Sequence, residues 1–67
     1  MMEQGKMIEQ IVSFVGENRE SQASVAICRR ILGHYPEEMD GRTLAKLRQG
    51  LEGAGQDEIE SCYYIVM

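Results

Sequence analysis

The sequence predicts an all-α fold, a small bundle of three main helices plus a C-terminal segment that is either a fourth helix or a pairing strand. Three observations support this prediction. Apolar residues recur with a helical period of 3.6 residues in three separate segments. Residues that start or end helices lie between these segments. The chain has only 67 residues, which is enough for one small helical domain, 1–67.

The first helix is expected at about residues 5–16. Its polar residues, such as Glu9 and Ser13, fall mainly on the other side of the helical wheel from its apolar ones. Gly16, followed by Glu17 and Asn18, is expected to end this helix, because glycine accepts the left-handed conformation that closes helices. The apolar side is made of Met7, Ile8, Ile11, Val12, Phe14 and Val15.

A second helix is expected after Ser21, whose side chain can cap its first turn. This helix should end near Gly33 to Tyr35, and Pro36 suits the first position of a short helical turn. Cys28 lies on the apolar side, where a free cysteine behaves as a small buried hydrophobic residue. The apolar side comprises Ala23, Ile27, Cys28, Ile31, Leu32 and Tyr35.

A third helix is expected from Arg42, with Leu44, Leu47, Leu51 and Ala54 along one side. Two glycines lie inside this pattern, at positions 50 and 53, and each weakens a helix by ~1 kcal/mol relative to alanine. A glycine in a helix often permits another element to approach closely. Gly55 is expected to terminate the helix, and Arg42, Lys46 and Gln49 should cluster on its polar face.

The tail 59–67 fits two patterns. Its Tyr63, Tyr64, Ile65 and Val66 favour a strand, whereas Ile59, Cys62, Tyr63 and Val66 have helical spacing. Asp57 and Glu58 suit a helix N-terminus, so the helix is preferred. Because three helices already offer apolar faces to one another, we expect this tail to make an intermolecular contact, in a homodimer or with another partner.

Composition excludes several classes of function. The net charge of −4 works against attraction to phosphate backbones and anionic lipids. No apolar run approaches the ~18 residues of a membrane span, so a cytoplasmic protein is expected, with Cys28 and Cys62 as free thiols. Paired metal-ligand spacings and nucleophile or phosphate-binding motifs are missing. We therefore expect neither an enzyme, nor a cofactor, nor a metal site.

Charge and tyrosine content indicate a protein partner. Two acidic clusters lie beside the basic residues of the middle section, and a cluster of this kind can complement a basic surface on another protein. Adjacent tyrosines are typical of interfaces, because they combine apolar area with a hydroxyl group that tolerates water. The expected partner-binding residues are Glu37, Glu38, Asp40, Asp57, Glu58, Glu60, Tyr63 and Tyr64.

Two fragments resemble the lambda-repressor-type helix-turn-helix family. The sequence SQASVA at 21–26 resembles the opening of the first motif helix, and TLAKLRQGLEGAG at 43–55 resembles the closing helix. Together they cover under a third of the chain. This resemblance implies DNA binding in which Arg42, Lys46 and Gln49 face the groove and the phosphates. The family's recognition turn has no counterpart here, since Pro36-Glu37-Glu38 lies between the fragments, so we expect no appreciable nucleic-acid binding.

The opening segment GKMIEQIVSFVG at 5–16, followed by a charged turn and a second helix, is similar to the start of some small phage-encoded anti-CRISPR proteins. This resemblance implies a compact acidic inhibitor that blocks a nucleic-acid-binding surface of a host complex. The function expected from the sequence is therefore non-enzymatic protein binding, regulatory or inhibitory, with a helix-turn-helix transcriptional regulator as the alternative.

Overall fold

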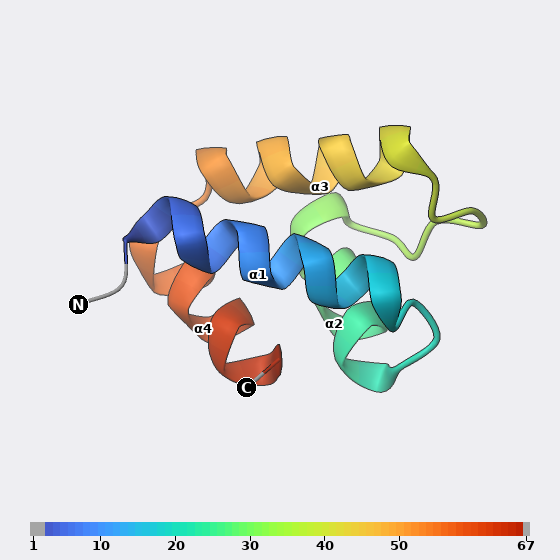
Figure 1. Ribbon diagram of the computed structural model, residues 1–67, viewed down its shortest axis with the longest axis horizontal. Helices are drawn as coiled ribbons and strands as arrows, with labels where there is room; N and C mark the ends of the chain where they lie inside the picture. The colour runs from blue at the N-terminus through green and yellow to red at the C-terminus, as the bar shows by residue number, and fades with distance from the viewer. Residues whose placement is uncertain (1–2, 67) are drawn as a thin grey trace.

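Four α-helices make up most of residues 3–66, the part of the chain that the computed structural model describes (Figure 1). No strand occurs in that range, so the all-α prediction is confirmed and the tail is a fourth helix. In Figure 1, α1 crosses the middle of the view, α3 lies above it, and α2 and α4 lie below it. The helices are α1 (Gln4–Glu17), α2 (Gln22–Leu32), α3 (Gly41–Gly53) and α4 (Gln56–Val66).

The end of α1 differs from the prediction. The helix continues through Gly16 to Glu17, and Asn18 closes it by donating its backbone N–H to the carbonyl oxygen of Phe14 at 2.8 Å. Gly16 does not have a positive φ. Its missing side chain instead makes room for Leu44, because a Cβ at this position would lie 3.2 Å from Leu44 Cδ1. The helix therefore ends within the stop expected at 16–18, but the left-handed conformation expected of Gly16 was wrong, since this glycine serves packing between α1 and α3.

The limits of α2 follow from its local chemistry. Ser21 is the N-cap, as predicted, and its Oγ accepts the backbone N–H of Ser24 at 3.1 Å. Gly33 ends the helix in the left-handed conformation with a φ of 84°, and its N–H bonds the carbonyl oxygen of Arg29. The buried Ser24 hydroxyl donates to the carbonyl oxygen of Asn18 at 2.6 Å, which fixes the turn that joins α1 to α2.

The connection between α2 and α3, residues 33–40, is irregular and contains no helical turn at Pro36. It is nevertheless fastened at both ends. The Tyr35 hydroxyl donates to the carbonyl oxygen of Arg19 in the preceding turn. Asp40 caps α3 by accepting the backbone N–H of Thr43 at 2.9 Å, and the Thr43 hydroxyl donates to the carbonyl oxygen of Glu38. These bonds hold the loop that carries one of the acidic clusters.

The turn between α3 and α4 consists of Ala54 and Gly55 only. Ala54 ends α3 in an extended conformation, and Gly55 has no positive φ, contrary to the role expected for it. The carbonyl oxygen of Gly55 instead accepts the backbone N–H groups of Glu58 and Ile59, which begins α4. Asp57 and Glu58 lie in the first turn of α4, as predicted, where negative charge favours a helix.

All four helices contribute to one core. α1 packs against each of the other three, whereas the consecutive helices α3 and α4 barely touch. The expected apolar sides of α1 and α2 are partly buried, and Cys28 is inaccessible as predicted. Their half-buried members are Met7, Phe14, Ala23, Ile31, Leu32 and Tyr35, and Tyr35 lies in the loop beyond α2. The core residues are Ile8, Ile11, Val12, Val15, Ile27, Cys28, Leu47, Leu51, Ile59 and Cys62.

At Gly50, α3 approaches α2 closely. A Cβ at this position would overlap the Cγ2 methyl of Ile31, whereas Gly53 in the same helix has nothing within 4 Å of a built Cβ. The Ile31 Cγ2 branches directly from a stiff β-carbon, so it has little freedom to move away. The expected close approach at a helical glycine is confirmed at Gly50.

We therefore expect opposite effects from two identical substitutions. Gly50→Ala should destabilise the protein by about 1 to 3 kcal/mol, because the overlap with Ile31 outweighs the gain in helix propensity. Gly53→Ala is the matched control and should be neutral or stabilising by up to ~1 kcal/mol. Urea unfolding followed by circular dichroism measures both, and equal effects at the two positions would contradict the packing described.

Candidate protein-binding surface

The fourth helix has an inner face that belongs to the core. Ile59 and Cys62 are completely buried, and Tyr63 and Val66 pack against the core from its edge. The Tyr63 side chain is thus half-buried against the protein's own core. The intermolecular contact was expected because the first three helices were thought to leave no room in the core for the tail. This premise was wrong, because the core has room for the inner face of α4.

The outer face of α4 consists of Asp57, Glu60 and Tyr64, which helical spacing places on one stripe. Asp57 and Tyr64 are exposed, and Glu60 is half-buried. Tyr64 is 76% exposed and is the most exposed large apolar side chain of residues 3–66. Ile65 beside it is 37% exposed. One carboxylate oxygen of Glu60 accepts from the Gln56 amide at 3.3 Å. The structure thus brings three of the expected partner-binding residues together.

Glu58 does not belong to this stripe, because it forms an ion pair with Arg30 of α2. Its carboxylate oxygens accept from Nε of Arg30 at 2.7 Å and from Nη2 at 3.1 Å, so the pair is bidentate and ties α4 to α2. The hydrogen bond from Arg30 lowers the pKa of Glu58, and the same bond raises the pKa of Arg30. The Glu58 carboxylate is therefore already used in a contact that stabilises the fold.

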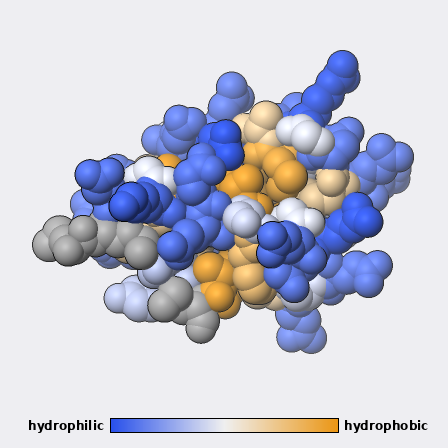
Figure 2. Space-filling model, viewed as in Figure 1, coloured by the Kyte–Doolittle hydropathy of each residue, from blue (hydrophilic) through white to orange (hydrophobic). Residues whose placement is uncertain are grey.

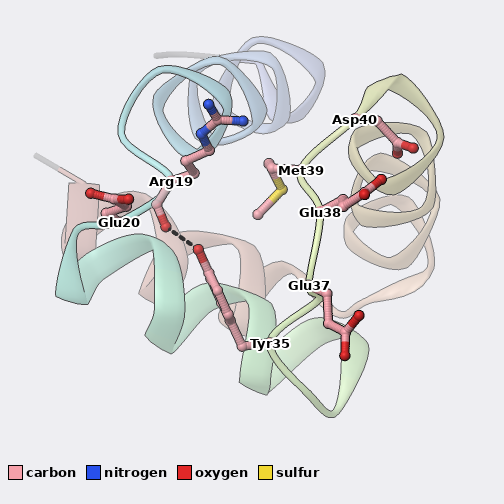
Figure 3. A pocket seen from close by; sticks show the side chains of 7 residues that line it. All are labelled: Arg19, Glu20, Tyr35, Glu37, Glu38, Met39 and Asp40. Atoms are coloured by element: carbon pink, nitrogen blue, oxygen red, sulfur yellow. Dashed lines mark hydrogen bonds between the residues drawn. The ribbon is translucent and has the colours of Figure 1, made fainter.

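The acidic residues of the loop 33–40 border the cavity shown in Figure 3, which has a volume of about 550 Å³. The side chains of Glu37, Glu38 and Asp40 lie on the side of the loop that faces away from the cavity, whereas Met39 points into it (Figure 3). The hydrogen bond from the Thr43 backbone lowers the pKa of Asp40. The three carboxylates are neighbours in sequence, but they do not converge on a common site.

The residues singled out for DNA binding lie together on α3. Arg42, Lys46 and Gln49 are all exposed on its outer face, and within residues 3–66 neither Arg42 nor Lys46 forms an ion pair. Arg48, on the flank of the same helix, donates to Glu9 of α1 at 2.9 Å. The outer face of α3, defined here as Arg42, Lys46 and Gln49, is therefore basic.

A shallow groove of about 530 Å³ lies between α1 and the end of α4, and sequence reasoning missed it. Phe14 and Val66 supply its apolar lining, and Glu9 and Glu17 lie at its polar edge. Apolar surface is visible among hydrophilic side chains near the middle of the face in Figure 2. The available signal was Phe14, which lies at the margin of the apolar stripe of α1 and not at its centre.

The two cysteines are buried, and the single histidine is exposed. Cys28 and Cys62 are free and fully buried, and burial raises the pKa of both thiols, which keeps them protonated. His34 is exposed, with its Nδ1 3.2 Å from the carbonyl oxygen of Leu32. Residues 3–66 contain no group of three or more His, Cys, Asp and Glu side chains arranged to hold a metal ion.

No helix within residues 3–66 is both long and apolar enough to span a membrane. Comparison with known proteins adds no further assignment, because no family model, no curated protein and no solved structure matches this chain. Its function must therefore be inferred from its own surfaces.

The Arg30–Glu58 pair predicts a pH dependence. Because the pKa of Glu58 is lowered in the folded state, the pair stabilises the protein above the ordinary glutamate pKa of about 4.3, and the contribution is lost as the pH falls through the lower, folded-state pKa. Glu58→Gln should lower the urea midpoint at pH 7 and have a smaller effect near pH 3. Glu60→Gln removes the same charge without breaking an ion pair and is the control. A deficit of Glu58→Gln that stays constant with pH would contradict this role.

Proposed function

We propose that this protein acts by binding another protein without catalysing a reaction, as a regulator or inhibitor, and that the outer face of α4 is its binding surface. The exposure of Tyr64 carries this proposal. The inner face of α4 satisfies the core through Ile59 and Cys62, so folding does not require an aromatic ring at position 64. A tyrosine held in water on a helix is better suited to a partner than to the monomer.

Tyr64 has the properties of an interface anchor. Tyrosine supplies a large contact area with few rotatable bonds, and it is among the residues that dominate binding energy at interfaces. Ile65 extends the apolar area on one side. The helix beneath is held by the core and by the Arg30–Glu58 pair, so the ring is presented on a rigid support.

The charge around Tyr64 limits the kind of partner. Asp57 and Glu60 lie on the same stripe, and α4 contains no basic residue. A partner with a basic surface would approach this face fastest and fit it best. Nucleic-acid-binding proteins carry such surfaces. Inhibition of one of them, as the resemblance to anti-CRISPR proteins implies, agrees with this charge pattern.

Tyr64→Ala tests the proposal directly. The wild-type protein is used to capture its partner from a lysate of the source organism, and the affinity for the purified partner is measured by calorimetry. Tyr64→Ala should weaken binding by about 30-fold or more, as expected for an anchor of about 2 kcal/mol. Gln22→Ala, an exposed substitution at the start of α2, should bind like the wild type. Unchanged affinity of Tyr64→Ala would contradict the proposed surface.

The second candidate function is DNA binding, and the shared exposure of Arg42, Lys46 and Gln49 favours it. Two observations count against it. The net charge is −4, and the eight residues 33–40 between α2 and α3 replace the three- or four-residue turn of a helix-turn-helix.

We expect no appreciable binding to duplex DNA in a mobility-shift experiment at low salt. Phosphate contacts from Arg42 and Lys46 would give an affinity that falls steeply as salt rises. A salt-sensitive shift at micromolar protein that Lys46→Ala weakens would favour the DNA-binding function over the proposed one.

A further inference from the structure

The outer faces of α3 and α4 carry opposite charges on opposite sides of the molecule. α3 and α4 lie on either side of α1 (Figure 1), and each turns its buried residues toward the shared core. The outer face of α3 therefore points broadly away from the outer face of α4. A single copy cannot bring the two faces together, but two copies can.

The two faces also have matching spacing. On α3, Lys46 follows Arg42 by four residues and precedes Gln49 by three. On α4, read in the reverse direction, Glu60 follows Tyr64 by four residues and precedes Asp57 by three. At a rise of about 1.5 Å per residue, both stripes span about 10.5 Å with the middle residue at the same place.

We infer that a second copy of this chain docks the outer face of its α3, antiparallel, onto the outer face of α4. This register pairs Lys46 with Glu60 and places the guanidinium of Arg42 over the ring of Tyr64, a cation–π contact. It also sets the Gln49 amide against the Asp57 carboxylate, where the amide can donate a hydrogen bond. All three pairs are complementary; five of the six side chains are exposed, and Glu60 is half-buried.

The interface joins two different faces, so it is heterologous. Two docked copies still have one free basic face and one free acidic face between them. Further copies can therefore add to form an open chain, unless the rotation between neighbouring copies closes a ring. Glu52 on the flank of the basic face and the net charge of −4 oppose contact at long range. Within a Debye length of ~10 Å, the paired charges decide the contact instead.

This inference rests on the proposed function to the extent that it uses the same face of α4. A copy bound there covers Tyr64, so self-association and partner binding exclude one another. The protein would then mask its own binding surface at high concentration and expose it on dilution.

A charge exchange tests the register. Sedimentation velocity in about 50 mM salt, with protein up to about 1 mM, gives the association constant of the wild type and its variants. The wild type should associate, and raising the salt to about 0.5 M should weaken association roughly tenfold. Lys46→Glu and Glu60→Lys should each weaken it by about tenfold or more, because like charges then meet. The double variant with both substitutions should recover most of the loss.

Lys6→Glu is the matched control, because it reverses an exposed lysine on α1 and should leave self-association within about twofold of the wild type. Circular dichroism verifies that every variant is folded. A wild type that stays monomeric, single reversals that associate like the wild type, or a double variant that does not recover would each overturn the inference.

The outcomes also separate this inference from the proposed function. If the wild type is monomeric while Tyr64→Ala still loses the partner, the inference fails and the proposed function stands. If the copies associate through Lys46 and Glu60 while Tyr64→Ala binds the partner normally, the reverse holds.

Discussion

The packing of the inner face of α4 onto the other helices is the interaction on which the rest of this structure depends. A chain of 67 residues buries only about 60% of the surface that its unfolded form exposes. Its stability therefore requires that the apolar face of every helix is buried. Ile59 and Cys62 are inaccessible to solvent, and a fully buried isoleucine contributes roughly 1.5 to 3 kcal/mol. Since α3 and α4 barely touch, α4 depends on α1 and α2 for this burial, and α1 is held from both sides.

Because one face of α4 must be buried, its residues fall into two groups, one in the core and one on the surface. Tyr63 and Tyr64 are adjacent, but one packs at the edge of the core and the other is 76% exposed, because neighbours in a helix point about 100° apart. The same rotation turns Glu58 toward Arg30, leaves Asp57 exposed and leaves Glu60 half-buried. Fixing the inner face therefore also fixes the composition of the outer face. The helix that completes the core is the one that presents the candidate binding surface.

Local signals in the sequence were enough for the helices and some of their limits, such as the Ser21 cap and the close approach at Gly50. Gly16 shows where local reasoning fails, because its role depends on Leu44, 28 residues away, and not on its own backbone. The Arg30–Glu58 pair likewise joins residues far apart in sequence. The candidate site was predicted in composition but not in arrangement, because eight acidic and aromatic residues were grouped by sequence. Only the fold shows which of them share a face.

If α4 is a permanent part of the core, it opens only when the whole protein unfolds, and native-state labelling of the two thiols measures this. Cys28 in α2 and Cys62 in α4 are both fully buried, so each reacts with a thiol reagent only when its surroundings open. Labelling rates, corrected for the reactivity of each thiol in the unfolded chain, give the free energy of opening at each site. Equal opening free energies, both matching global unfolding, are the expected result. If the surroundings of Cys62 open about tenfold or more often than those of Cys28, α4 undocks by itself, and it is not a permanent part of the core.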